Sequence, residues 1–243
     1  MDRAPLTELF KKLETRDQLS DAERLALQQA AGEIRRYPAG SDLVVEGSEP
    51  TASTLLVDGM ASRYNLTESG KRQITAVHVP GDFVDLHSFP LKRMDHSVGA
   101  LTNCVVVAFP HAGLERLTEN FPHLTRMLWM LTLIDGALHR RWLVSMGRTF
   151  AESHLAHFLC EIYLRLEVVG RAGGHRMKLP VTQQELGDIL GVSAVHANRT
   201  VQALRADHLI EWTGPDVRML DWDRLVDVGQ FEPSFLYFER RPR

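Results

Sequence analysis

The chain has 243 residues, of which 44% are hydrophobic and 24% charged, and its formal net charge is −3. This length and composition exclude a disordered chain and allow two modest domains, each with its own core. The small negative charge argues against a strongly basic surface for nucleic acid. Acidic residues elsewhere in the chain could still balance a local basic patch. The polar amino-terminal stretch and the lack of a membrane-length apolar run predict a cytoplasmic protein without a membrane partner.

Two short helices are predicted at the start of the chain. Leu6, Leu9 and Leu13 recur at helical spacing, and Ser20 with Glu23 three residues later can form a capping box for a second helix. Residues 33–110 then change to short alternating or β-rich segments that are separated by glycines. Such spacing is typical of a compact antiparallel barrel or jelly roll, and a plain sandwich is the alternative.

Pro122 is placed to open a long helix. Apolar residues then alternate at spacings of three and four, as in the seam of a coiled coil. The predicted dimerisation residues are Leu124, Met127, Leu131, Ile134 and Leu138. Further apolar residues widen the stripe, so one face can pack on the β-rich domain while the seam meets the same helix of a second subunit. A buried helix of a monomer is the alternative. The pattern ends near Arg140 and Arg141, and Gly147 marks a predicted hinge.

The two cysteines, Cys104 and Cys160, each lie within an apolar pattern. Two thiols cannot by themselves build a four-thiolate iron–sulfur site or a zinc site. We therefore interpret both as buried core residues and predict no cofactor, with a redox role as the alternative.

A pair of short helices separated by a glycine turn is predicted at residues 182–206. Thr182 with Glu185 forms a capping box, Gly191 closes the first helix, and Ser193 can cap the second. On the second helix the apolar residues fall on one side. The other side is predicted to carry Val195, Asn198, Arg199 and Gln202. Side chains of these types can read base edges in the major groove, and a helical hairpin with a solvated polar face is the alternative.

Two short strand-like segments follow this helix pair, at residues 209–212 and 217–220, with a turn at Gly214 and Pro215. They are interpreted as a two-stranded wing from which Arg218 can reach a phosphate. The tail beyond Trp222 is too apolar to be disordered. We expect it to pack against the body of the protein, and a partner surface is the alternative.

The run TQQELGDILGVSAVHANRTVQALR, followed by IEWTG, resembles the winged helix-turn-helix of the Crp/Fnr family of bacterial transcription regulators. The resemblance implies that Ser193, His196, Asn198 and Arg199 meet DNA, with Arg199 as the base-reading arginine and Gln183 near a phosphate. Val195 stands where the family often has a glutamate. A carboxylate can accept a hydrogen bond from cytosine and valine cannot, so the operator is expected to differ from well-known family sites.

The glycine turns and the run Pro80-Gly81-Asp82-Phe83 are similar to the β-roll sensor domain of the same family. In its cyclic-nucleotide-binding members a Gly-Glu pair binds the ribose and an Arg-Ser pair holds the phosphate. The matching positions here form the candidate effector pocket, Asp85 with Leu86 and His96 with Ser97. Because the matching arginine and glutamate are missing and Asp85 adds repulsion, we predict that cyclic AMP is not the signal. A cyclic-nucleotide-responsive regulator is the alternative.

Four histidines of the β-rich region, His78, His87, His96 and His111, raise the possibility of a cupin-like metal site. They include no His-x-His pair, and the nearest carboxylates show no three-ligand spacing, so the sequence predicts no metal. No nucleophile with a base is visible either, and an enzyme is not expected. A cupin-like metal-binding protein is the weaker alternative.

The predicted fold class is α+β, with a β-roll sensor domain at residues 1–118, a dimerisation helix at residues 119–147, and a winged helix-turn-helix with its tail at residues 148–243. The predicted function is transcription regulation by a homodimer on a palindromic site in double-stranded DNA. RNA polymerase is a further partner if the protein activates transcription. The signal, and the choice between activation and repression, are left open by the sequence.

Overall fold

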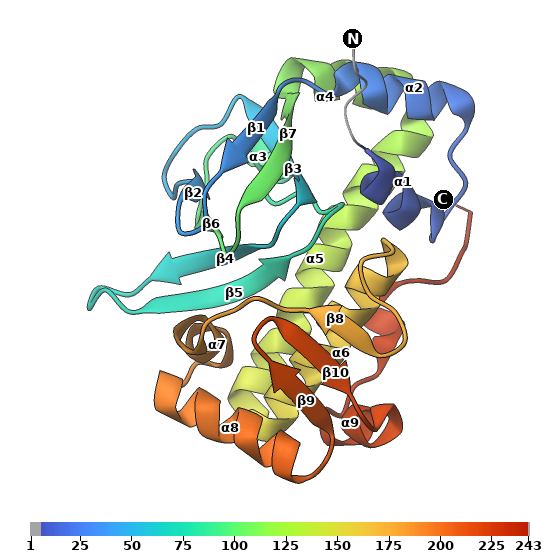
Figure 1. The fold of residues 1–243 in the computed structure, drawn as a ribbon. Helices are drawn as coiled ribbons and strands as arrows, with labels where there is room; N and C mark the ends of the chain where they lie inside the picture. Colours follow the sequence, from blue (N-terminus) through green and yellow to red (C-terminus); the bar gives the residue numbers. More distant parts are fainter. Residues whose placement is uncertain (1–5, 243) are drawn as a thin grey trace. The chain divides into compact units, whose positions relative to one another are not determined.

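The computed structural model describes residues 6–242 and confirms the predicted α+β architecture (Figure 1). Residues 1–5 and 243, at the two ends of the predicted domains, lie outside the described residues. The contacts divide the chain into two compact units. Among the described residues, unit 1 comprises residues 6–65, 77–136 and 237–242, and unit 2 comprises residues 66–76 and 137–236.

The two predicted amino-terminal helices are present in unit 1 as α1 (Thr7–Glu14) and α2 (Asp21–Ala30). The capping box is confirmed, because the Ser20 hydroxyl accepts from the Glu23 amide while the Glu23 carboxylate accepts from the Ser20 amide. Both helices place leucines in the core of unit 1, and Leu27 is fully buried.

Two antiparallel sheets form the predicted β-roll. The first has the order β1-β7-β3 and the second the order β2-β6-β4-β5. The strands are β1 (Ile34–Tyr37), β2 (Asp42–Val44), β3 (Ala52–Asp58), β4 (Ala61–Leu66), β5 (Arg72–His78), β6 (Ser97–Ala100) and β7 (Cys104–Pro110). Two short helices accompany them, α3 (Ser88–Leu91) and α4 (His111–Asn120). Leu56, Val98 and Val106 belong to one apolar cluster of the roll, and a second cluster joins the roll to the helices of unit 1.

The long helix α5 (Pro122–Arg148) begins at the predicted proline but continues past Arg140 and Arg141. The helix ends at Arg148, one residue after the predicted boundary at residue 147, and the next helix begins at Ala151, so the hinge at Gly147 stays a prediction. A tertiary contact supports the extension, because the indole Nε1 of Trp142 donates to Glu161 Oε2 at 2.7 Å within unit 2. No helix among residues 6–242 has the length and apolar character needed to cross a membrane.

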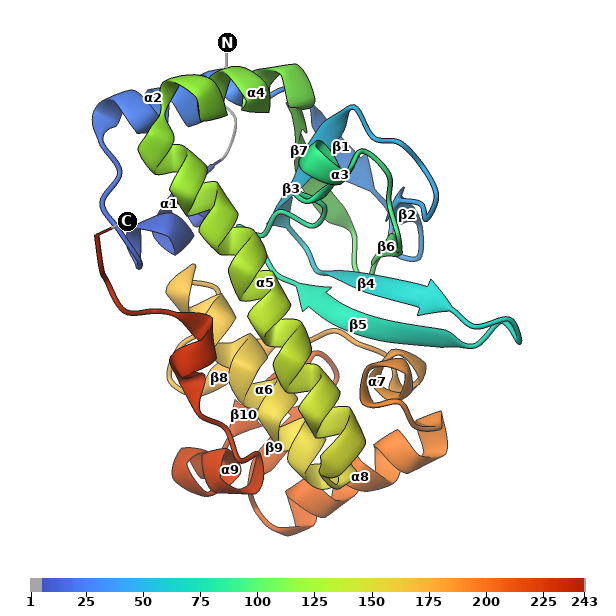
Figure 2. The ribbon, with the colours of Figure 1, turned by 180° about the vertical axis from the view of Figure 1, so that it is seen from behind.

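The face of α5 that the sequence assigned to dimerisation is buried in the chain itself. Leu124, Met127, Leu131 and Ile134 belong to the core of unit 1, and Leu138 is 8% exposed. Figure 2 shows α5 as one continuous helix. A different face of it is open to solvent, where Trp129, Leu133 and Leu143 are 64%, 58% and 73% exposed. Two apolar faces are present, as predicted, and the residues of the predicted seam pack inside the chain, because spacing alone does not say which face meets the roll.

Unit 2 is organised around the buried helix α6 (Ala151–Val168), which is covered on nearly all sides. A three-stranded sheet follows the order β8-β10-β9, with β10 in the middle. Its strands are β8 (Arg176–Lys178), β9 (Ile210–Thr213) and β10 (Asp216–Met219), so β8 is an edge strand beside the predicted two-stranded wing. The helix pair is α7 (Gln183–Leu190) and α8 (Ala194–Ala206).

The apolar tail packs against unit 2, as expected, through α9 (Trp222–Val228) and a 3-10 turn at Pro233–Leu236. Leu225, Phe231 and Leu236 are buried, with exposed fractions of at most 5%. Tyr237, which the sequence grouped with them, is 50% exposed.

Candidate nucleic-acid interface

The turn between α7 and α8 is built by the residues that the sequence singled out. The Thr182 hydroxyl accepts from the Glu185 amide at 3.1 Å, and Glu185 accepts from the Thr182 amide at 2.7 Å. Gly191 ends α7 in the left-handed conformation with φ of 71°. Gly187 lies so close to the next helix that an added Cβ would stand 2.8 Å from the Val192 carbonyl oxygen. Glycine at these two positions allows α8 to start immediately beside α7.

The inner face of α8 packs in unit 2, as predicted. Ala197, Val201 and Leu204 are at most 4% exposed, and Thr200 joins them with its hydroxyl donating to the His196 carbonyl at 3.0 Å. The Ser193 hydroxyl caps the helix by accepting from the His196 amide at 3.2 Å. These contacts fix both the start and the rotation of α8, and therefore which side chains point outward.

The outer face of α8 carries the predicted reading residues in exposed positions, Val195, His196, Asn198, Arg199 and Gln202. Within residues 6–242 the side chains of Asn198 and Arg199 make no hydrogen bond or ion pair, and only Gln202 has a neighbour, Arg205, at 3.4 Å. Asn198 and Arg199 are therefore held on a rigid helix with their donors directed at solvent and not used inside the protein. An outside acceptor can be bound without breaking an internal contact.

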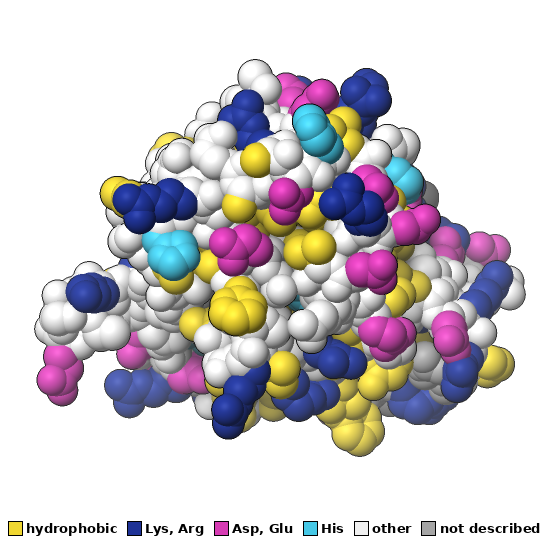
Figure 3. All heavy atoms as spheres, turned by 90° about the horizontal axis from the view of Figure 1, so that it is seen from below, with side chains coloured by type: hydrophobic (Ala, Val, Ile, Leu, Met, Phe, Trp, Pro, Cys, Tyr) yellow, Lys and Arg dark blue, Asp and Glu magenta, His cyan; other side chains and the backbone are white. Residues whose placement is uncertain are grey.

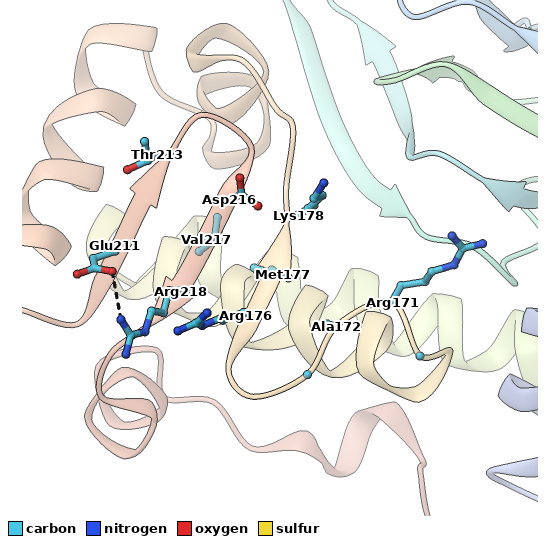
Figure 4. Close-up of a pocket in the computed structure, with 12 residues that line it drawn as sticks. Arg171, Ala172, Arg176, Met177, Lys178, Glu211, Thr213, Asp216, Val217 and Arg218 are labelled. Atoms are coloured by element: carbon cyan, nitrogen blue, oxygen red, sulfur yellow. Dashed lines mark ion pairs between the residues drawn. The ribbon is translucent and has the colours of Figure 1, made fainter.

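Gln183 is exposed at the first position of α7, as expected for a residue that approaches a phosphate. Arg218 is exposed on β10 and lies 3.6 Å from Glu211 of β9, a weak surface ion pair. Figure 4 shows Arg218 and Glu211 on a groove of about 710 Å³ along the wing sheet. Arg171, Arg176 and Lys178 also line this groove. Because Glu211 and Asp216 share this groove, its charge is mixed.

The wider surface is also mixed in charge. On the face drawn in Figure 3, Lys and Arg side chains alternate with Asp and Glu, without one continuous basic field. This agrees with the net charge of −3. Binding to nucleic acid would therefore depend on a few placed contacts more than on a general electrostatic attraction.

The tip of the β4–β5 hairpin, residues 66–76, supports α7 within unit 2. Arg72 Nε lies 2.8 Å from Asp188 Oδ2, and Gln73 Nε2 donates to the Asp188 carbonyl oxygen at 2.7 Å. Asp188 also accepts from Gln184 Nε2 at 2.9 Å. The two contacts of Arg72 and Gln73 with Asp188 join residues more than a hundred positions apart, and no local pattern of the sequence signals them.

The candidate effector pocket is not an open cluster of four side chains. Asp85 is fully buried and accepts from the amide and hydroxyl of Thr54, and Leu86 belongs to the core of unit 1. Burial raises the pKa of Asp85 to about 7, despite the hydrogen bonds from Thr54 that lower it. The sequence analysis expected a full negative charge at Asp85 that would repel a phosphate. The structure instead has a carboxyl that is partly protonated near neutral pH, so this repulsion is weaker than expected.

His96 and Ser97 are also buried and engaged. The Ser97 hydroxyl accepts from the Glu46 amide at 3.0 Å, and His96 Nδ1 lies 2.7 Å from Asp95 Oδ1. Burial, followed by the nearby charge of Arg63, lowers the pKa of His96 to about 4. His96 is 5% exposed, and its Nε2 has no hydrogen-bond partner within the described residues.

Arg63 is a buried charge that the sequence analysis missed. It lies on β4 with 5% of its surface exposed, and its Nη2 is 2.8 Å from Asp135 Oδ2 of α5. Its positive charge contributes to the pKa shifts of His78, Asp85 and His96, which places it in the interior of the roll. The burial of the first three residues of β4 is a result of the fold and was not available as a signal in the sequence.

The four histidines considered for a metal site separate in the structure. His78 lies 3.8 Å from Asp82, and His111 lies 3.3 Å from the hydroxyls of both Ser53 and Ser88. His87 and His96, however, converge with Asp95 so that one ligand atom from each lies within 4.8 Å of the others. A candidate three-ligand set, which the spacing along the chain did not indicate, is therefore present, while the prediction of no metal stays a prediction.

Both cysteines are buried, as predicted. Burial raises the pKa of Cys160 to about 12 and also raises that of Cys104, whose thiol donates to the Met60 carbonyl oxygen. A raised pKa lowers the thiolate fraction, and these environments are those of core residues.

Two family descriptions match the chain, a cyclic nucleotide-binding domain at residues 34–121 and a Crp-like helix-turn-helix domain at residues 153–228. Together they account for about two thirds of the chain. The first covers the strands of the roll with α3 and α4, and the second covers α7, α8 and the wing.

Among characterised proteins, the transcriptional activator protein FnrL of Cereibacter sphaeroides is 28% identical over 211 residues, which are 85% of this chain and 84% of that protein. The nitrogen fixation regulation protein FixK of Bradyrhizobium diazoefficiens is 26% identical over 206 residues, covering 83% of this chain and 84% of FixK. The solved structure of FixK2 from Bradyrhizobium japonicum matches with a TM-score of 0.71 at 22% identity, covering 82% of this chain and 96% of that one. That likeness shows the fold.

Proposed function

Because this chain belongs to the Crp/Fnr family of transcription regulators, we propose that it acts as a homodimer that reads a palindromic DNA site. It is a DNA-binding regulator and not an enzyme, since its relatives are transcriptional activators and its matched domains are regulatory and DNA-binding. The observation that carries the proposal is the outer face of α8, where exposed donors of Asn198 and Arg199 have no partner among residues 6–242.

Arg199 and Asn198 are the proposed base readers. The guanidinium of Arg199 can donate two hydrogen bonds to guanine O6 and N7, and the amide of Asn198 can pair with adenine N6 and N7. Val195 can contact a thymine methyl. We assign register-setting contacts with the sugar-phosphate backbone to the remaining exposed polar residues, Gln183, Ser193, His196, Gln202 and Arg218.

The proposed dimer seam is the solvent-exposed face of α5. Trp129, Leu133 and Leu143 lie there at the three-and-four spacing of a coiled coil, with Gly136 and Arg140 between them. Large apolar side chains exposed in a row on one helix are stabilised when a second copy covers them. A two-fold pair of α8 helices would then read two half-sites about 34 Å apart.

The proposed regulator does not respond to cyclic AMP. The buried guanidinium of the roll, Arg63, is already paired with Asp135, and the positions that would take ribose and phosphate are engaged with Thr54, Asp95 and Glu46. Because the relatives are named activators, we propose RNA polymerase as a further partner, and the cytoplasm as the compartment where the DNA is read.

The proposal is tested by selecting bound duplexes from a random pool with the full-length protein. We expect an enriched palindrome, and we expect Arg199→Ala to weaken binding to it by about 1 to 3 kcal/mol per half-site and to remove the preference at one base position. Arg224→Ala is the matched control, because Arg224 is an exposed arginine of α9 that already pairs with Asp221. An equal loss in both variants, or no enriched sequence, would contradict the reading role of α8.

The seam is tested separately by sedimentation of Trp129→Glu/Leu133→Glu. We expect monomers that keep their fold by circular dichroism and lose most of their affinity for the palindrome, because two half-sites no longer bind together. The control Arg116→Glu changes charge at an exposed position of α4, outside the proposed seam, without removing apolar surface. A dimeric double variant would eliminate this seam.

A further inference from the structure

The loop between α3 and β6 brings three metal-ligating side chains together. His87 precedes α3, and Asp95 and His96 immediately precede β6. Asp95 Oδ1 is the common neighbour, at 2.7 Å from His96 Nδ1 and 4.0 Å from His87 Nε2. The two imidazole rings lie side by side with centroids 4.9 Å apart.

These distances suit a divalent ion with short bonds. Ligand atoms that each lie about 2.1 Å from a tetrahedral zinc ion are about 3.4 Å from one another. The two separations from Asp95, 2.7 and 4.0 Å, lie on either side of this value, and all three ligand atoms lie within 4.8 Å of one another, so the side chains must rotate toward a common centre to bind one ion.

The local charge also favours a cation. Asp95 brings one negative charge, and the positive charge of Arg63 is matched by Asp135 at 2.8 Å. Two imidazoles and a carboxylate are ligands that suit zinc and ferrous iron, and three protein ligands leave at least one position for water or a small molecule.

The contact that a metal would replace is weakly held. The side chain of Asp95 is 79% exposed, so its hydrogen bond with His96 is open to water on one side. His96 is buried, and its Nε2 has no hydrogen-bond partner within the described residues. The single hydrogen bond between His96 and Asp95 can therefore be replaced by bonds from both side chains to a metal ion.

We propose that His87, Asp95 and His96 bind one first-row divalent transition-metal ion, of the zinc or ferrous type, in the β-roll. The bound ion would tie the start of α3 to the start of β6 and close the intervening loop. Its open coordination position would face the solvent side that Asp95 occupies. The site is separate from the DNA-reading residues and does not depend on their assignment.

The test is a titration of the metal-free full-length protein with Co²⁺ and, separately, Zn²⁺, followed by calorimetry and by the visible absorption of cobalt. We expect one ion per chain, cobalt bands of four- or five-coordination, and a higher melting temperature with metal. Asp95→Asn and His96→Ala should each weaken binding at least about tenfold. His111→Gln, which removes a histidine of the same domain outside the trio, should bind as the parent does.

Asp95→Asn keeps the test decisive even if His96→Ala fails to fold, because Asp95 is an exposed residue and its replacement is nearly isosteric. Absence of stoichiometric binding in the parent protein would overturn the proposal. Stoichiometric binding that persists unchanged in Asp95→Asn would place the ion at other residues and would overturn it as well.

Discussion

The outer face of α8 and the interior of the β-roll both gather polar side chains, but they hold them in opposite states. On α8, Asn198 and Arg199 are exposed and have no partner among residues 6–242. In the roll, Arg63, Asp85 and His96 are buried and engaged with neighbouring side chains. Replacing a residue on α8 should therefore change affinity for DNA and spare stability, whereas replacing one in the roll should change stability first.

The largest expected effect is that of Asp135→Ala. It removes the carboxylate at 2.8 Å from the buried guanidinium of Arg63 and leaves that charge in a poorly solvated place. We expect the free energy of unfolding to fall by about 3 kcal/mol, as measured by denaturant titration. The double variant Arg63→Met/Asp135→Leu removes both charges and should recover most of the loss. An unchanged free energy of unfolding in Asp135→Ala would contradict the view that polar groups of the roll stabilise the fold whereas those of α8 do not.

The next largest effect is a fall in the free energy of unfolding at acid pH that comes from His78. Burial lowers its pKa to about 4, so between pH 4 and 6.5 the unfolded chain binds a proton that the folded protein does not. The contribution to stability is complete above pH 6.5 and is lost as the pH falls, by about 3 kcal/mol at pH 4.

The measurement is the unfolding free energy of the parent and of His78→Gln at several pH values. The parent should lose stability more steeply below pH 6.5 than the variant does. His196→Gln, on the exposed face of α8, should follow the parent curve within about 0.5 kcal/mol. Parallel curves for the parent and His78→Gln would contradict the assignment.

For Asn198→Ala on α8 we expect a loss of DNA binding without a loss of stability. The loss of its amide should cost about 1 to 2 kcal/mol of binding per half-site and relax the choice at one base pair, measured on single-base variants of the selected duplex. Its melting temperature should match that of the parent, because the side chain has no partner among residues 6–242. A variant that loses stability but keeps base preference would place Asn198 in a structural role.

The smallest effect is expected from Arg218→Ala in the wing. A residue that contacts phosphate should weaken binding uniformly across sequences, by less than about 1 kcal/mol, and lower the slope of log affinity against log salt by about one per subunit. The exposed ion pair with Glu211 at 3.6 Å adds little to stability. A loss confined to one base position would instead make Arg218 a reader.

Elements specified by local chemistry were predictable. The helix pair follows from the hydroxyls of Thr182 and Ser193, the glycine at 191 and the apolar spacing on α8, all of which act over a few residues. The β-roll was recognisable from its short strands and glycine turns. The burial of both cysteines was predictable from the apolar residues around them in the sequence.

Elements that depend on distant contacts were not predictable. Four of the five predicted dimer residues pack in the core of unit 1, and the tertiary contact of Trp142 lies beyond Arg141, where the apolar pattern was expected to end. Arg63 and Asp135 lie 72 positions apart in the sequence, and their pairing is made by the fold alone.

By itself the sequence determined the class of the protein and the side of α8 that faces outward, because capping and helical periodicity are properties of short segments. Only the tertiary structure decided which apolar face of α5 is exposed, which polar groups of the roll are engaged, and that His87 meets Asp95 and His96. Those outcomes depend on how strands and helices far apart in the chain pack, and spacing along the chain does not encode that packing.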